Sequence, residues 1–334
     1  MKKKLLAILM SAMMVASLAA CGGSSEGTTS DDASTGDAAA TSQTYNIGIC
    51  QLVEHEALDA ATEGFKQALI DLCGEENVTF DLQNAQGEQA MCSTIINNFV
   101  SADVDLIMAN ATAPLTTAAT ATADIPVIGT SVTDYATALQ IEDWTGATGI
   151  NVSGTCDLAP IDEQAAMLQE LLPEAKTVGI LYCSAEPNSK YQAEKFMEAI
   201  EADGITCIEY TAADSNEIQS VVTSAVSEVD AIYVPTDNTM ASNTEIIKNV
   251  CVPAGIPVIA GEQGICTGCG IATLSISYYD IGYRAGEMAY EVLANGADIS
   301  TMPIETAPNV TKMYNAAICE ELGITVPDDY EAIE

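Results

Sequence analysis

Polar residues that follow apolar strands are the part of this sequence best suited to binding chemistry. Residues 229–238, VDAIYVPTDN, predict a buried strand that runs out into a polar loop containing Asp237. Residues 104–112, VDLIMANAT, repeat the pattern in the first half of the chain and run out at Asn110. Each segment is followed by a helical stretch and a further apolar strand. Two halves that each deliver a polar loop at the end of a strand predict one ligand held between two domains.

The elements that must position these loops are strands and helices in alternation. Near-continuous apolar strands, such as TVGILYC at 177–183, are typical of a parallel sheet covered on both faces. The chain from about residue 44 to 334 is long for one core and suits two α/β domains. The pattern restarts after Asn151, where we expect the first crossing between the domains.

A general rule for open parallel sheets identifies candidate site residues, because ligands bind beyond the carboxyl ends of the strands. Asp157, just past the first crossing, is expected at the mouth of the same cleft. The polar residues in the loops that follow the strands are Glu54, His55, Asn110, Thr112, Ser131, Asn188, Ser189, Asp237, Asn238 and Glu262.

The first residues predict export. Lys2, Lys3 and Lys4 precede a short apolar stretch that ends in Leu-Ala-Ala-Cys21, so residues 1–20 are interpreted as a secretory signal peptide. The ending resembles the bacterial lipobox, which implies cleavage before Cys21 and a lipid on its sulfur. The alternative is an ordinary signal peptide whose cleavage site contains a cysteine by chance. Residues 21–43 have almost no large apolar side chain and are expected to be a flexible tether.

Charge excludes one class of partner. The sequence has 48 Asp and Glu against 10 Lys and Arg, a formal net charge of -38. Such a chain repels nucleic acid and anionic lipid headgroups, so we expect neither as a partner. Most acidic residues are then surface charge, and only those in special positions are site candidates.

The residues needed for catalysis or for a metal site are scarce. His55 is the only histidine, so Ser-His or Cys-His catalysis would depend on it alone. Of the 11 cysteines only Cys266 and Cys269 have motif spacing, which is too few ligands for structural zinc. Both a disulfide and a pair of free thiols are open for them. The glycines of 261–270 do not form G-x-G-x-x-G. We therefore predict no enzyme activity, no metal and no cofactor.

Six segments, in the same order and spread over the whole mature domain, resemble those of a substrate-binding lipoprotein of a bacterial ABC importer. More narrowly, they resemble the group whose members include a tryptophan-binding protein. The segments are VEHEALDAATEGF (53–65), ANATAP (109–114), NVSGTCDLAP (151–160), LYCSAEPNS (181–189), VDAIYVPTDNT (229–239) and ATLSISYYDIGYRAGEMA (272–289).

The resemblance implies a type I periplasmic binding protein, with two Rossmann-like α/β domains and parallel sheets joined by a three-crossing hinge. The first domain would comprise 44–150 plus 278–303 and the second 151–277 plus 304–334. It also implies an extracytoplasmic protein held at the cell membrane by lipidated Cys21. Its partners would be a small-molecule ligand, expected to be an aromatic amino acid, and the permease and ATPase subunits of an ABC importer. The alternative is a sensory lipoprotein that presents its ligand to a membrane receptor.

An amino-acid ligand would need two polar anchors. Its carboxylate needs hydroxyl donors and free backbone N–H groups, which Thr112 and Ser131 suit. Its ammonium needs a buried carboxylate, for which Asp237 and Asp157 are the candidates. His55 could stack on the ligand side chain or hydrogen-bond to it. The alternative for each acid and hydroxyl is a helix cap, and for His55 a cap or a surface position.

Overall fold

The computed structural model describes residues 43–307 and 309–333. The predicted signal peptide at 1–20 and the predicted lipid site Cys21 lie outside these residues, as does the predicted tether apart from residue 43. In the described part of the chain, no helix combines the length and the apolar character needed to cross a membrane.

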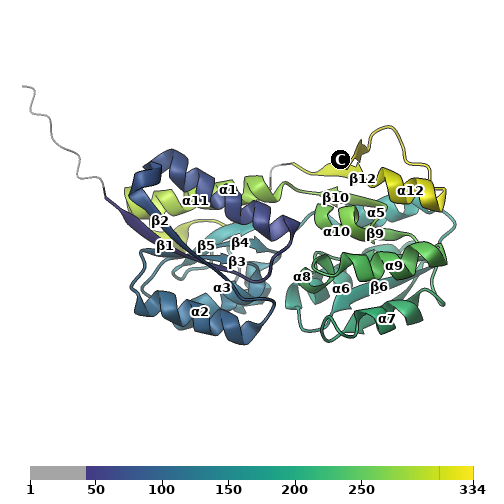
Figure 1. The fold of residues 1–334 in the computed structure, drawn as a ribbon, viewed down its shortest axis with the longest axis horizontal. Coiled ribbons are helices and arrows are strands. Elements are labelled where there is room, and N and C mark those ends of the chain that lie inside the picture. The colour runs from purple at the N-terminus through teal and green to yellow at the C-terminus, as the bar shows by residue number, and fades with distance from the viewer. Residues whose placement is uncertain (1–42, 308, 334) are drawn as a thin grey trace, which may run out of the picture. The chain divides into compact units, whose positions relative to one another are not determined.

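The first lobe is built on a six-stranded sheet with the strand order β11-β5-β4-β3-β1-β2 (Figure 1). Every neighbouring pair in it is parallel. The strands are short and mostly buried, which agrees with the apolar runs of the sequence. They are β1 (Tyr45–Gln51), β2 (Val78–Asn84), β3 (Leu106–Asn110), β4 (Val127–Val132), β5 (Val152–Cys156) and β11 (Glu305–Thr306).

Helices cover both faces of this sheet. On one face α1 and α11 pack together so closely that a Cβ on Gly282 would clash with the carbonyl oxygen of Ala61. The glycine is therefore required by the helix contact. The helices of this lobe are α1 (Glu56–Cys73), η1 (Glu75–Asn77), α2 (Gln89–Ser101), α3 (Thr112–Ala121), α4 (Tyr135–Leu139), α11 (Tyr278–Asn295) and η2 (Ile299–Thr301).

The second lobe has a seven-stranded sheet with the order β13-β12-β10-β9-β8-β6-β7. It is parallel except where β12 runs antiparallel to β10. Its strands are β6 (Thr177–Cys183), β7 (Thr206–Ala212), β8 (Ala231–Val234), β9 (Val258–Ala260), β10 (Ala272–Ser275), β12 (Thr311–Tyr314) and β13 (Glu331–Ala332).

Two apolar cores, one on each face of the second sheet, hold the helices of this lobe. Phe196 stacks on Tyr233 in the first of these cores, with ring centroids 3.6 Å apart. The helices are α5 (Ile161–Leu171), α6 (Pro187–Glu201), α7 (Ile218–Ala225), α8 (Asn238–Ala241), α9 (Thr244–Ala254), α10 (Gln263–Cys269) and α12 (Ala316–Leu322).

The chain passes between the lobes three times, after β5, after β10 and after β11. The first crossing comes after Cys156, later than the predicted position near Asn151, because β5 pairs with β4 in the first sheet. The third comes after Thr306, later than the predicted boundary at 303, because β11 pairs with β5. Short buried strands have the same composition in either sheet, so only their pairing decides the lobe to which they belong.

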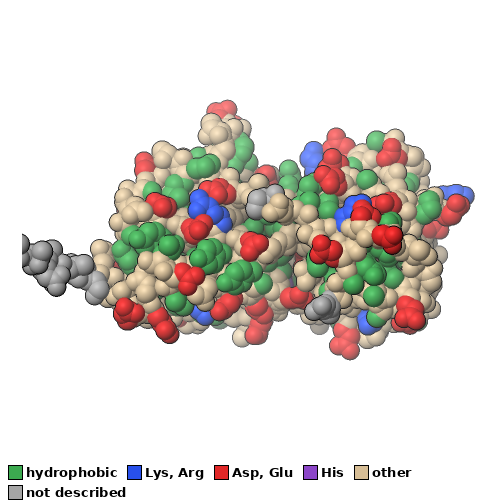
Figure 2. All heavy atoms as spheres, turned by 90° about the horizontal axis from the view of Figure 1, so that it is seen from above, with side chains coloured by type: hydrophobic (Ala, Val, Ile, Leu, Met, Phe, Trp, Pro, Cys, Tyr) green, Lys and Arg blue, Asp and Glu red, His purple; other side chains and the backbone are tan. Residues whose placement is uncertain are grey.

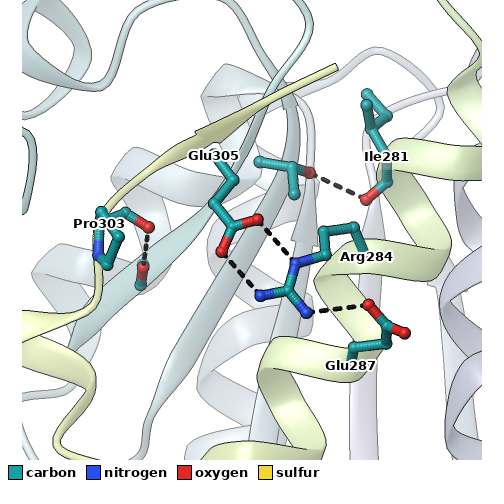
Figure 3. A network of polar contacts seen from close by, with 7 residues as sticks. Ile281, Arg284, Glu287, Pro303 and Glu305 are labelled. Carbon is teal, nitrogen blue, oxygen red and sulfur yellow. Dashed lines mark hydrogen bonds and ion pairs between the residues drawn. The ribbon is translucent and has the colours of Figure 1, made fainter. Parts of the chain in front are cut away.

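The last crossing is held by the only arginine in the sequence (Figure 3). Arg284 of α11 donates from Nε and Nη2 to the two carboxylate oxygens of Glu305, each at 2.7 Å. Its Nη1 donates to Glu287 at 2.8 Å. Beside it, the Thr155 hydroxyl donates to the Ile281 carbonyl oxygen at 3.1 Å. These bonds join β5, β11 and α11 where the chain leaves the first lobe.

Candidate ligand-binding site

The carboxyl ends of strands from both lobes meet at one small cavity. Its volume is about 10 Å³, which is room for about one water molecule. Residues from the end of β4 and from the segments that follow β1 and β5 face residues from the segments that follow β6, β8 and β9. The lining residues are His55, Leu58, Ser131, Asp157, Asn188, Thr236, Asp237, Asn238, Ala241, Glu262 and Tyr278.

Ser131 forms the first-lobe wall and has unused hydrogen-bonding capacity. Its side chain is 6 % exposed, and its Oγ has no hydrogen-bond partner among the described residues. Its backbone φ is +56°, a left-handed conformation that costs energy for a residue with a Cβ. On the neighbouring strand end, Ala111 has a φ of +97° just before α3 begins. Strain and an unpaired buried hydroxyl at one place are typical of a binding site.

Asp237 lies on the opposite wall and is buried, with 1 % of its surface exposed. It caps α8 by accepting the Met240 backbone N–H at 2.8 Å, and its other oxygen accepts the Cys183 backbone N–H at 2.6 Å. Burial, and then the neighbouring charge of Glu186, raise the pKa of Asp237 to about 8. Asp237 therefore caps a helix, which was the alternative left open by the sequence, and it also lines the cavity.

Glu262 and Asp157 add two more buried carboxyl groups. Glu262 caps α10 through the backbone N–H groups of Gly264 and Ile265, and burial raises its pKa to about 7. Asp157 caps no helix. It accepts hydrogen bonds from the Thr133 hydroxyl at 3.1 Å and the Tyr278 hydroxyl at 3.0 Å. Burial raises the pKa of Asp157 to about 6.

The cavity has no fixed positive charge to balance these acids. Among the described residues, none that lines it is Lys or Arg. His55 is the only basic side chain present, and burial lowers its pKa, which favours the neutral ring. The three carboxyl groups therefore lack a counter-charge, and a ligand with a cationic group would favour their ionised forms. Figure 2 shows that acidic side chains also outnumber basic ones over the outer face that it presents.

Side chains of the two lobes touch each other at the cavity. His55 Nε2 lies 3.2 Å from Asn238 Oδ1, across 183 positions of sequence. Gln192 of α6 donates from Nε2 to the Thr133 hydroxyl at 3.2 Å. Together with the small cavity volume, these contacts describe a closed cleft.

The other four predicted site residues do not line this cavity. Glu54 is exposed and lines an outer groove with Lys66, and Thr112 lines a separate small cavity beside Tyr191. Ser189 is fully buried and accepts a bond from Asn188. Asn110 is also buried.

The Asn110 amide serves the packing of the first lobe. Its Nδ2 donates to the Leu58 carbonyl oxygen at 2.8 Å and to the Thr62 hydroxyl at 2.9 Å. The strand-end rule identified the correct edge of the sheet for this residue, but it does not say in which direction each side chain points.

Several residues of the site were not predicted. Glu186 accepts bonds from Asn238, Thr239 and Asn188 beside the cavity. Its position directly before Pro187, at a helix start, was the available signal. Tyr278 was also not predicted. The N-cap of α11 is Ser277, which accepts the Asp280 backbone N–H, so the helix begins at Tyr278 and this side chain reaches Asp157.

The cysteines hold neither a disulfide nor a metal cluster within the described residues. Cys266 and Cys269 are buried in α10 as free thiols, and Cys269 Sγ donates to the Ile265 carbonyl oxygen at 3.4 Å. Burial raises the pKa of both thiols, so they are protonated small hydrophobic groups in the second lobe.

Comparison with known proteins identifies the class. Residues 46–332 match the family model of ABC transporter substrate binding proteins. A tyrosine-binding protein of Clostridioides difficile (strain R20291) is 37 % identical over 272 residues, which is 81 % of this chain and 78 % of that protein. The chain therefore belongs to the ABC transporter substrate-binding protein family. It has the fold of type I periplasmic binding proteins, as predicted, and members of this family bind a solute without transforming it.

Two solved structures of relatives differ in how well they superpose on this chain. One, from Streptococcus pneumoniae in complex with L-Trp, has a TM-score of 0.83 at 32 % identity and covers 87 % of this chain and 100 % of its own. The other is a ligand-free, open substrate-binding protein with adhesive properties from Clostridium difficile. It has a TM-score of 0.67 at 36 % identity and covers 87 % of this chain and 99 % of its own. The better fit to the ligand-bound relative agrees with the closed cleft.

Proposed function

We propose that this protein is an extracytoplasmic, lipid-anchored solute-binding protein that captures an aromatic amino acid between its lobes and delivers it to an ABC importer. The observation that carries the proposal is the polarity of the cavity. Asp157, Asp237 and Glu262 surround it without a Lys or Arg, and an unpaired Ser131 hydroxyl lies on the opposite wall. A ligand with an ammonium group and a hydrogen-bond acceptor matches that arrangement. The tyrosine-binding and L-Trp-bound relatives support an aromatic side chain.

The proposed binding mode uses both walls. The ligand ammonium lies against Asp237 and Asp157, where its charge favours their ionised forms. The ligand carboxylate accepts from the Ser131 hydroxyl. Thr112 lies two positions after Asn110 at the start of α3, and its role as a second carboxylate donor stays a prediction. His55 and Tyr278 provide aromatic surface for the side chain.

Ligand entry requires the cleft to open. The closed cavity holds about one water molecule, far less than an amino acid needs. The His55–Asn238 and Gln192–Thr133 contacts must therefore separate to admit the ligand and then adjust around it. An importer that recognises the closed form can distinguish loaded from empty protein only if the ligand shifts the balance between open and closed forms.

The proposal is tested by calorimetry on a soluble form of the chain that starts after Cys21. The protein is first unfolded and refolded to remove any co-purified ligand. L-tyrosine, L-tryptophan and L-phenylalanine are the main ligands. Tyramine lacks the carboxylate, 3-(4-hydroxyphenyl)propanoate lacks the ammonium, and glucose is a neutral control. We expect the amino acids to bind, tyramine and the propanoate to bind more weakly, and glucose not to bind. Binding of glucose alone, or binding of the propanoate as tightly as tyrosine, would contradict the assignment of an amino acid as the ligand.

The lipid anchor is proposed from the Leu-Ala-Ala-Cys21 ending, which resembles a lipobox. Two acyl chains on a glycerol are enough for stable anchoring, whereas one is marginal. In a bacterial host, fatty-acid labelling is expected to mark the wild-type protein in the membrane fraction. The Cys21→Ala variant is expected to lose the label and the membrane association. Labelling of the Cys21→Ala protein would place the lipid elsewhere.

A further inference from the structure

Glu186 is buried beside the cavity and has the position of a helix cap without that role. It is 9 % exposed and directly precedes α6, yet its side chain makes no capping bond to that helix. Its two carboxylate oxygens instead accept from the first turn of α8. Oε2 accepts from Asn238 N at 3.1 Å and Asn238 Nδ2 at 2.7 Å, and Oε1 accepts from Thr239 N and Oγ1, each at 2.8 Å.

These four hydrogen bonds, which we call the Glu186 clamp, determine which way the Asn238 amide points. A backbone N–H donates to each oxygen of Glu186, so both oxygens act as acceptors and the Asn238 group that faces Oε2 must be its NH₂. The amide oxygen then faces the other way, 3.2 Å from His55 Nε2. Because an amide oxygen also only accepts, the hydrogen in that contact must be on His55 Nε2. Glu186 therefore determines the protonation of a ring in the other lobe through one intervening side chain.

We propose that Glu186 is a positioning residue of the ligand site, which fixes the amide of Asn238 and through it holds His55 as the Nε2–H tautomer across the closed cleft. Asn238 then presents only an acceptor to the cavity. With the ionised forms of Asp237 and Glu262, which a cationic ligand favours, it makes the second-lobe wall a surface of acceptors that selects for ligand groups that donate. The tautomer depends on the geometry alone, and the effect on ligands rests on the proposed function.

Glu186→Gln separates this role from simple packing, since the side chain keeps its shape. The introduced amide can still accept from Thr239, but its NH₂ would face the NH₂ of Asn238. The Asn238 amide is expected to turn over, so that its NH₂ faces His55. The neutral ring then accepts at Nε2 and carries its hydrogen on Nδ1. Glu198→Gln is the matched control, because Glu198 is on the same helix and pairs only with the exposed Lys195.

The test is NMR of the chain labelled with ¹⁵N-histidine, expressed without a histidine tag. His55 is the only histidine, so the imidazole signals belong to it alone. Wild type and Glu198→Gln are expected to have the hydrogen on Nε2, and Glu186→Gln on Nδ1. An Nδ1–H ring in wild type, or an Nε2–H ring that persists in Glu186→Gln, would overturn the proposal. The wild-type spectrum decides the first point even if Glu186→Gln fails to fold.

Ligand binding gives the second readout, with L-tyrosine and 3-(4-hydroxyphenyl)propanoate as probes. Glu186→Gln is expected to bind L-tyrosine about tenfold more weakly, because a donor replaces an acceptor on the wall. Its preference for tyrosine over the propanoate is expected to fall, whereas Glu198→Gln is expected to match wild type. An unchanged preference in Glu186→Gln overturns the link to ligand selection. If wild type binds neither probe but shows the Nε2–H ring, the proposed ligand is wrong and the positioning role holds.

Discussion

The two walls of the cavity differ in how far their polar groups are already satisfied. On the second-lobe wall, Asp237 accepts one backbone N–H from α8 and one from β6. Glu262 accepts two backbone N–H groups at the start of α10. On the first-lobe wall, Ser131 is buried on strained backbone without a partner among the described residues. The second-lobe acids therefore already stabilise their own lobe, whereas the Ser131 hydroxyl has no such partner and is available to the proposed ligand. Substitutions on the two walls should separate stability from affinity.

The largest effect is expected from Asp237→Ala. The change leaves the buried N–H groups of Met240 and Cys183 without acceptors and removes the α8 cap. We expect a loss of about 3 kcal/mol in the free energy of unfolding, measured by urea denaturation, together with loss of amino-acid binding. Asp298→Ala, which removes an exposed cap remote from the cavity, is the control and should cost much less. An Asp237→Ala protein as stable as wild type would contradict a structural role for this wall.

The stability of the ligand-free protein should fall as the pH rises. The pKa values of Asp157, Glu262 and Asp237 are raised to about 6, 7 and 8, so between their ordinary values near 4 and these values the folded state binds more protons than the unfolded state. We expect the free energy of unfolding, measured by urea denaturation, to fall steadily between pH 5 and pH 8. Repulsion among the surface acids acts in the same direction, so Glu262→Gln is the control and should flatten the slope. A free energy of unfolding that rises over this pH range would show that the pKa values of these three acids are not raised by folding.

Ligand binding should have the opposite pH dependence. An ammonium group favours the ionised acids, so affinity for L-tyrosine should increase from pH 5 to pH 8 and binding should release protons. Calorimetry at pH 7 in two buffers of different ionisation enthalpy measures the release directly. Proton uptake on binding would show that the ammonium does not lie against these carboxyl groups.

Ser131→Gly should separate the first wall from the second. Glycine adopts the φ of +56° without strain, so we expect stability to rise by about 0.5 kcal/mol. Loss of the hydroxyl should weaken L-tyrosine binding about tenfold. Gln140→Gly relieves a similar φ of +55° at the exposed end of α4 and is expected to leave affinity unchanged. Equal affinity for L-tyrosine in Ser131→Gly and wild type would show that the Ser131 hydroxyl does not bind the ligand.

The smallest effect is expected at the third crossing, outside both walls. Arg284 and Glu305 are about 41 % and 35 % exposed, so solvent screens their bidentate pair. Arg284→Ala should lower the free energy of unfolding by about 1 kcal/mol in urea denaturation and leave ligand affinity close to that of wild type. A loss as large as that of Asp237→Ala would mean that the crossing, and not the walls, dominates the stability of the protein.

The sequence was sufficient for the class of fold and for most of the predicted residues that line the cavity. Apolar runs alternating with helical stripes predicted the α/β fold, because the burial of each element depends on residues close in sequence. Seven of the eleven predicted residues line the cavity. Asp157 was placed by its position after the first crossing, and the rule that ligands bind beyond strand ends supplied the other six, which are His55, Ser131, Asn188, Asp237, Asn238 and Glu262. Their role as ligand contacts stays a prediction.

What only the tertiary structure decided was pairing and direction. Whether β5 belongs to the first sheet depends on its partner β4, and no local pattern carries that information. Asn110 and Ser131 both lie at strand ends, yet packing turns Asn110 toward α1 and leaves Ser131 facing the cavity. The clamp of Glu186 on Asn238 and the contact of Asn238 with His55 join residues 52 and 183 positions apart. The first contact forms when the second lobe folds and the second only when the two lobes meet, so the sequence supplied the candidates and the tertiary structure assigned their partners.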